Sequence, residues 1–290
     1  MEVALAAIER LEVRGRDSAG LHLLVGGHGL DPDDPAIARL IEARAADRLF
    51  TAGAVRVAAD HLGFVYKTAA EIGELGDNTA RLREQIRSDE LLHLALRAPS
   101  ATVTVLGHTR WASVGIISEP NAHPLSQEGA DGADLPYVTA ALNGDVDNYA
   151  DLQALEHLEF PAEITTDAKV IPALVARRLL LEADAVEAFR ATVATLEGSV
   201  AIAVGTALDP DALLLAQRGS GQALYVGLAP WGTVVASEPY GIVAECTRSL
   251  RLDGEAMLDP GDPATQGQVV RVTAEGAGGD RKSTRLNSSH

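Results

Sequence analysis

The chain has 290 residues, of which 47% are hydrophobic, 22% charged and 4% aromatic. This composition is typical of a globular protein that buries one large core or two small ones. Its 24 basic and 41 acidic residues give a formal charge of −17, which disfavours nucleic acid and anionic membrane surfaces as partners. No apolar run approaches the roughly 20 residues of a membrane span, and the N-terminus is unlike a signal peptide. A single cysteine, Cys246, rules out an internal disulfide and a cysteine-rich zinc site, and is typical of a cytoplasmic protein.

The predicted elements, taken in chain order, alternate between helices and strands. Apolar side chains at helical spacing predict helices at 3–11, 35–50, 79–97, 168–181 and 184–196. Apolar and β-branched runs predict strands at 21–25, 63–66, 101–106, 137–142, 198–205, 212–217, 224–228, 233–237 and 269–273. Strands clustered around paired helices indicate a layered α+β fold.

Both ends of the chain are unusual. Residues 280–290 read DRKSTRLNSSH, which resembles the translation of a sequencing-library adapter, so we expect this tail to be an artefact. The natural protein would then continue past Gly279. The chain also opens inside a helical pattern with no N-cap residue before it, so we expect a segment to be missing upstream.

Polar clusters follow three predicted strands, where a rigid scaffold presents functional groups. Arg110 can hold a carboxylate bidentately, and Asp167 can hold an ammonium, so together they would grip an α-amino acid. Asn143 and the Gly144 N–H can donate hydrogen bonds to a developing oxyanion. Taken singly, each feature has a simpler reading, because Asn-Gly is typical of turns, Thr-Asp of helix caps and Arg-Trp of surface stacking.

The combination is specific because five motifs occur in order. They are RGRDSAG at 14–20, GHTRWA at 107–112, NAHP at 121–124, NGDVDNY at 143–149 and TTDAKVI at 165–171. In these motifs the chain resembles the glutaminase domain of the glutamine–fructose-6-phosphate aminotransferases, also called glucosamine-6-phosphate synthases. RGSGQAL at 218–224, ASEP at 236–239 and RLDGE at 251–255 extend the resemblance.

The resemblance implies a class II glutamine amidotransferase of the N-terminal-nucleophile hydrolase type. Its fold would be a four-layer αββα sandwich, here with the first strand missing. In the family an N-terminal cysteine attacks the glutamine side-chain amide and its own α-amino group is the general base. The ammonia is used to make glucosamine 6-phosphate for aminosugar and cell-wall precursor synthesis. We expect a cytoplasmic enzyme that forms a homodimer, uses no cofactor or metal, and binds no nucleic acid or membrane.

The same resemblance assigns roles to individual residues. Asn143 and Gly144 would form the oxyanion hole, and Arg110 and Asp167 would bind the α-carboxylate and α-amino group of L-glutamine. The remaining assigned residues are Trp111 in the loop that gates ammonia passage, Ser113 beside the substrate, and Arg14, which would orient the N-terminal cysteine.

The largest departure from the family is the nucleophile. The family begins Met-Cys-Gly-Ile about sixteen residues before the point that matches Met1, and internal Cys246 has no free α-amino group to replace that cysteine. We therefore expect the chain to lack glutaminase activity by itself and its sheet to have an unfilled position. Smaller departures are Arg16, Val114 and the Ala168–Lys169 pair, together with NGDVDNY in place of NGIIENY.

These observations predict an amidotransferase domain at 1–255, with a helical insertion at about 26–58, followed by the start of a linker at 256–279. The sugar-isomerase half that would bind fructose 6-phosphate has no counterpart here. Two alternatives stay open: another class II amidotransferase, such as amidophosphoribosyltransferase or asparagine synthetase, and a non-catalytic glutamine-binding relic. A metal site on His108 and His123 is disfavoured because no third ligand has suitable spacing.

Overall fold

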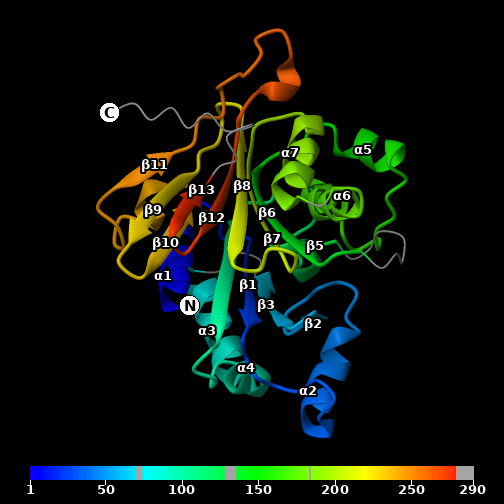
Figure 1. Cartoon of the computed structure of the whole chain (residues 1–290), viewed down its shortest axis with the longest axis vertical. Helices are drawn as coiled ribbons and strands as arrows, with labels where there is room; N and C mark the ends of the chain where they lie inside the picture. The colour runs from blue at the N-terminus through cyan, green and yellow to red at the C-terminus, as the bar shows by residue number, and fades with distance from the viewer. Residues whose placement is uncertain (70–73, 128–134, 183, 279–290) are drawn as a thin grey trace.

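The computed structural model describes residues 1–69, 74–127, 135–182 and 184–278, so the expected artefact at 280–290 lies outside the described residues. Two antiparallel sheets stack face to face between two layers of helices (Figure 1). The predicted α+β class and the αββα arrangement are confirmed. No helix in the described ranges is both long and apolar enough to cross a bilayer.

The first sheet has the strand order β2-β3-β1-β4 and is antiparallel throughout. Its strands are β1 (Ser18–Gly26), β2 (Val55–Ala58), β3 (His61–Ala69) and β4 (Thr102–Arg110). Four helices accompany it: α1 (Glu2–Leu11), α2 (Pro35–Ala45), α3 (Asp77–Ser88) and α4 (Glu90–Ala95). Alternation along β1 sends Leu21 and Leu23 into one buried cluster with Leu5 and Ile8 of α1.

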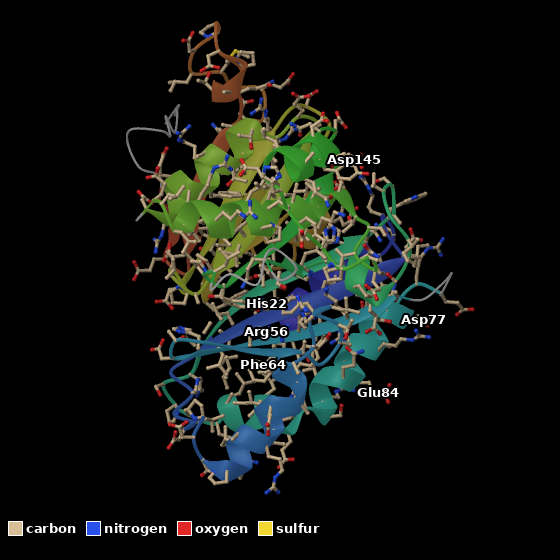
Figure 2. The ribbon with its side chains drawn as sticks, turned by 90° about the vertical axis from the view of Figure 1, so that its right-hand side faces the viewer. His22, Arg56, Phe64, Asp77, Glu84 and Asp145 are labelled. Carbon is tan, nitrogen blue, oxygen red and sulfur yellow. The ribbon has the colours of Figure 1, made fainter. Side chains whose placement is uncertain are left out.

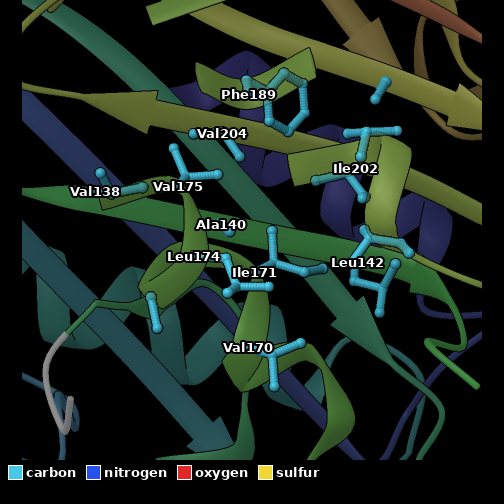
Figure 3. Close-up of a cluster of buried hydrophobic side chains, with 14 of the residues drawn as sticks. Val138, Ala140, Leu142, Val170, Ile171, Leu174, Val175, Phe189, Ile202 and Val204 are labelled. Carbon is cyan, nitrogen blue, oxygen red and sulfur yellow. The ribbon is translucent and has the colours of Figure 1, made fainter. Parts of the chain in front are cut away.

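The second sheet has the strand order β13-β12-β8-β7-β6-β5. Its strands are β5 (Leu125–Ser126), β6 (Val138–Gly144), β7 (Val200–Thr206), β8 (Ala212–Arg218), β12 (Gln268–Thr273) and β13 (Gly276–Gly278). Helices α6 (Val170–Leu179) and α7 (Ala185–Thr195) cover its outer face, and the short α5 (Tyr149–Leu155) lies beside α6. Val138, Ile202 and Val204 of the sheet pack against Ile171 of α6 and Phe189 of α7 in the largest core cluster (Figure 3).

The space between the two sheets holds polar side chains as well as apolar ones. Tyr137, just before β6, joins His22 of β1 by a hydrogen bond of 2.8 Å. Tyr137 can pack there because Gly63 of β3 has no side chain, and a Cβ at Gly63 would lie 2.7 Å from the Tyr137 hydroxyl. In the side view His22 lies in the middle of the molecule, between the green helices above and the blue and cyan helices below (Figure 2).

A third, small sheet is formed by β9 (Tyr225–Ala229), β10 (Gly232–Ala236) and β11 (Ser249–Arg251). Leu224 and Val226 of this region pack with Leu215 and Val272 of the second sheet. Cys246 is half-buried, and its thiol donates to the Ile242 carbonyl at 3.4 Å.

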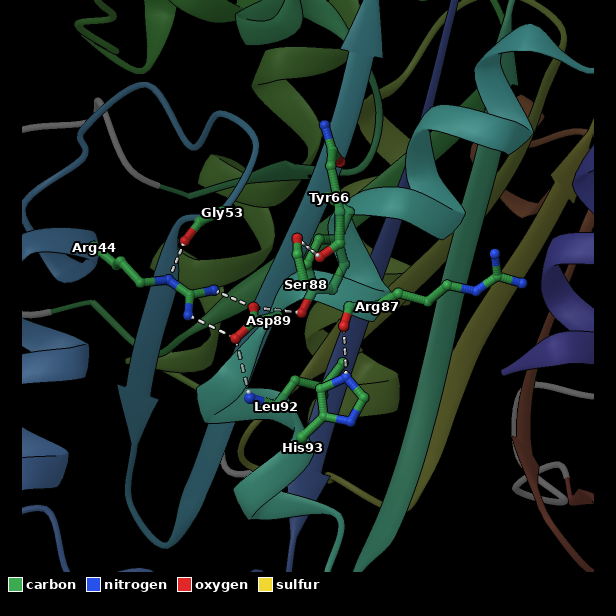
Figure 4. Close-up of polar contacts among 9 residues, drawn as sticks. Arg44, Gly53, Tyr66, Arg87, Ser88, Asp89, Leu92 and His93 are labelled. Atoms are coloured by element: carbon green, nitrogen blue, oxygen red, sulfur yellow. Dashed lines mark hydrogen bonds and ion pairs between the residues drawn. The ribbon is translucent and has the colours of Figure 1, made fainter.

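Two of the predicted helices differ from the structure. The helix expected over 35–50 ends at Ala45, so the segment 26–58 holds a single helix and then contributes β2 to the first sheet. The helix expected over 79–97 is two helices, because Asp89 has an extended backbone and its side chain caps Leu92. The Arg44 guanidinium pairs with both Asp89 oxygens, at 2.9 and 2.5 Å, which fixes this break (Figure 4). Periodicity alone could not reveal a break that a distant arginine stabilises.

Candidate active site

A cavity of about 1140 Å³ lies beside β4, between the two large sheets and α1. The structure brings every site residue named from the sequence to its lining: Arg14, Arg110, Trp111, Ser113, Asn143, Gly144 and Asp167. The cavity also has an apolar wall that includes Ala201, Ala203 and Leu213 from the inner face of the second sheet. Along its free edge β4 pairs with no strand of the described ranges. The opening is therefore both a polar site and a groove along a strand edge.

Arg110 ends β4 and turns its guanidinium toward the loop that follows. It donates to the Ile116 carbonyl at 3.1 Å and to the Val114 carbonyl, and the residue is 4% exposed. Burial lowers the pKa of Arg110, while the negative charges of Asp167 and Asp17 raise it. A guanidinium has five N–H donors, so Arg110 shapes the 112–116 loop and keeps donors for a ligand.

The RGRDSAG turn positions the start of that loop. Asp17 accepts a hydrogen bond from the Ala112 N–H at 2.8 Å, and its own N–H donates to the Arg110 carbonyl at 3.1 Å. Gly15 packs so closely that a Cβ would lie 2.6 Å from the Arg110 carbonyl carbon. Arg14 forms an ion pair with Glu238 of the ASEP motif. The motif thus ties β4 to the segment after β10.

The NAHP motif positions the loop before Asp167 and the end of β6. Asn121 is fully buried, and its side-chain oxygen accepts from the N–H groups of Thr165 and Thr166 at 2.7 and 2.9 Å. His123 Nδ1 accepts from the Leu142 N–H at 3.2 Å. These two side chains set the loop before Asp167 and the end of β6 relative to each other.

Asp167 begins a short 3-10 helix before α6 and is 4% exposed. Its Oδ2 accepts from the Val146 N–H at 2.7 Å, and its Oδ1 accepts from the Thr166 hydroxyl at 3.3 Å. Burial raises the pKa of Asp167 and the negative charge of Asp145 raises it further, against the Val146 hydrogen bond, which lowers it. The carboxylate is therefore a poorly solvated anion that a cationic ligand would stabilise.

Asn143 and Gly144 end β6 at the cavity. Gly144 has φ +114°, and a Cβ there would lie 2.0 Å from the Ser199 carbonyl oxygen, so glycine is required on both counts. Successive N–H groups of a strand point to opposite edges. Because the Leu142 N–H points to His123, the Gly144 N–H, two residues on, lies on the same edge and away from β7.

Two further residues line the mouth of the cavity. Trp111 is 76% exposed on its rim. The Ser113 hydroxyl donates to Asp145 Oδ1 at 2.5 Å, which joins the loop after β4 to the turn after β6. Figure 2 labels Asp145 near the upper helical layer.

His108 and His123 both line the cavity, and their ring centroids lie 4.5 Å apart. Burial lowers the pKa of His108 to about 4 and holds the pKa of His123 well below its usual value, so both rings are neutral at pH 7. Across the ranges that the structure describes, no three or more His, Cys, Asp or Glu residues gather in a metal-binding arrangement. The two tilted imidazoles pack against each other, and His123 also accepts the Leu142 N–H, so their observed contacts are with the scaffold of the site.

Comparison with known proteins supports the resemblance. No protein-family model matches the chain. The chain is 33% identical over 198 residues to the glutamine–fructose-6-phosphate aminotransferase of Gloeobacter violaceus, covering 68% of this chain and 31% of that protein. It is 30% identical over 281 residues to the enzyme of the same name from Acidithiobacillus ferridurans, covering 96% of this chain and 35% of that protein. The chain is a relative of the glutamine–fructose-6-phosphate aminotransferases.

The chain spans about a third of the length of these aminotransferases. Among solved structures it matches a glutamine phosphoribosylpyrophosphate amidotransferase from B. subtilis with a TM-score of 0.59 and 18% identity, covering 99% of this chain and 47% of that one. At that identity the match shows the fold, which is the amidotransferase fold expected from the motifs.

Sequence reasoning found the aminotransferase motifs but assigned no role to several residues inside them. Asp17, Asn121 and His123 touch the backbone of the site rather than the space of a ligand, so residue chemistry alone gave them no task. Asp145 appeared only as a departure from the usual motif, and its contact with Ser113 is visible only in the structure.

Proposed function

We propose that the cavity binds L-glutamine and that the chain is the glutaminase part of a glutamine–fructose-6-phosphate aminotransferase. Ammonia released from the glutamine side chain would be transferred to fructose 6-phosphate on a part of the protein outside this chain. The observation that carries the proposal is the meeting of a buried cation, a buried anion and a strand-end Asn-Gly pair in one cavity. The names and extent of the sequence relatives support it.

Recognition of an α-amino acid follows from the two buried charges. Arg110 and Asp167 attract each other electrostatically but form no ion pair, and each is held by backbone or hydroxyl partners instead. The α-carboxylate of an incoming amino acid would pair with Arg110 and its α-ammonium with Asp167. These two pairs would offset part of the desolvation cost of both buried charges. A ligand with only one of the two charges would leave the other buried group uncompensated.

The Asn143–Gly144 pair would stabilise the tetrahedral oxyanion. The Gly144 N–H lies on the cavity edge of β6, and no hydrogen bond links the Asn143 side chain to another described residue. Two donors free of other partners and fixed by a strand are the arrangement that oxyanion stabilisation needs.

The cavity lining described here contains no cysteine, so the nucleophile must come from elsewhere. We propose that an extended segment with an N-terminal cysteine pairs with the free edge of β4 and fills the groove against Ala201 and Ala203. The cysteine would then lie near Asn143, and its α-amino group would serve as the base. By the same resemblance we propose a cytoplasmic homodimer.

Calorimetric titration of L-glutamine into the chain tests the binding step. We expect saturable binding that Asp167→Asn weakens at least tenfold, because a hydrogen bond to a charged group is worth about 1.5–3 kcal/mol. Asp211→Asn, a change of the same type at the opposite part of the lining, should leave binding unchanged. Absence of binding to L-glutamine would refute the proposal. Glutamate release from glutamine only after addition of a Cys-Gly-Ile peptide would support the proposed origin of the nucleophile.

A further inference from the structure

Asp145 lines the cavity, but none of the roles assigned to the site residues involves it. It follows Gly144 directly, lines the same cavity as Asn143 and Asp167, and accepts the Ser113 hydroxyl at 2.5 Å. That contact joins the exposed Asp145 carboxylate to the loop after β4, at the wall of the cavity.

The negative charge of Asp145 is not neutralised locally. The only side chain found to bond it among the described residues is the neutral Ser113, and no cation there pairs with it. Its field reaches into the site, because it contributes, after burial, to the raised pKa of the Asp167 carboxyl. The side-chain carboxylate of a ligand placed at the Asn143–Gly144 end of the cavity would feel the same repulsion from Asp145.

We propose that Asp145 makes the cavity selective for amino acids whose side chain ends in a neutral group and against those that end in a carboxylate. The inference rests on the proposed function, which places the side-chain carbonyl of glutamine at Asn143 and Gly144. Glutamine presents a neutral amide beside Asp145, whereas glutamate presents a second anion. Asp145 therefore favours the substrate over the product of amide hydrolysis and promotes product release.

Binding of L-glutamine and L-glutamate to the unmodified chain and to Asp145→Asn tests this selectivity without needing turnover. We expect Asp145→Asn to strengthen glutamate binding about fivefold relative to glutamine, as expected for one screened unit charge near the protein surface. The difference should shrink in 0.5 M salt. Asp147→Asn is the matched control, since Asp147 is exposed, two residues away and not part of the cavity lining.

The outcomes separate the two proposals. Glutamine binding with an unchanged glutamine-to-glutamate ratio in Asp145→Asn overturns the role of Asp145 and leaves the proposed function intact. Absence of glutamine binding to the unmodified chain overturns the proposed function itself. If Asp145→Asn unfolds, Asp145→Ser serves as the second variant, with circular dichroism to confirm the fold. An equal change in the Asp147→Asn control would also count against the inference, because it would indicate a general charge effect.

Discussion

Lys67 of β3 should destabilise the folded chain at neutral pH, so Lys67→Met should stabilise it. The side chain is completely buried, and its Nζ has no hydrogen-bond partner among the described residues. Nζ lies 5.1 Å from the centroid of the Phe50 ring, a favourable cation–π contact. Methionine has a similar length and no charge, so it should fill the same space.

The magnitude follows from the pKa. Burial lowers the pKa of Lys67 from 10.5 to about 7, although the charges of Asp47 and Glu119 raise it. At 1.36 kcal/mol for each pKa unit this difference corresponds to about 5 kcal/mol. The cation–π contact with Phe50 offsets about 1–2 kcal/mol of that, so we expect a net gain of about 3–4 kcal/mol at pH 6.

The stability effect of Lys67 depends on pH in a direction that the lowered pKa determines. The folded chain binds the Lys67 proton less tightly than the unfolded chain does. The free-energy cost of burying Lys67 is therefore absent above pH 10.5, where the side chain is neutral in both states. It grows as the pH falls and is complete below about pH 7. The gain from Lys67→Met should therefore shrink by about 3 kcal/mol between pH 6 and pH 9.5.

Urea unfolding at the two pH values measures both effects. Lys169→Met is the control, because Lys169 Nζ lies 5.0 Å from the Phe160 ring centroid but also donates to the Ile164 carbonyl at 3.2 Å. Losing that hydrogen bond should cost about 1 kcal/mol. Two results would refute this prediction: a Lys67→Met chain less stable than the unmodified chain at pH 6, or one stabilised equally at both pH values. Either would show that other interactions offset the desolvation cost of the buried ammonium.

Three further predictions concern the site. Gly144→Ala should lose at least about 2 kcal/mol in urea unfolding, because φ is +114° and the new Cβ would meet the Ser199 carbonyl; a neutral result would mean that the turn relaxes. Asp17→Ala should cost about 1–2 kcal/mol and weaken glutamine binding by freeing the Ala112 N–H; unchanged affinity in calorimetry would separate the loop from the site. Glutamine binding should weaken as the pH falls through the raised pKa of Asp167, because the protonated carboxyl no longer attracts the ammonium, and a flat profile from pH 7.5 to 4.5 would contradict this.

Local sequence was sufficient for the layers of the fold. The β-branched run before Gly107 and the apolar run before Asn143 predicted β4 and β6, because alternating and continuously apolar segments favour strands that are buried on one or both faces. The residue types and the order of the motifs predicted an amino-acid site at Arg110, Asp167 and Asn143. The structure places all three on one cavity, and amino-acid binding there stays a prediction.

Tertiary contacts decided what no local pattern contains. Whether the helix over 79–97 breaks at Asp89 depends on Arg44, which lies 45 positions earlier. Whether Lys67 is solvated or buried depends on the segment around Phe50, whose ring lies against its Nζ. Asp145 reads as an ordinary turn residue until Ser113 is brought beside it. Propensity and periodicity describe neighbours along the chain, whereas burial, pKa and selectivity arise from charges and carbonyls that only folding brings together.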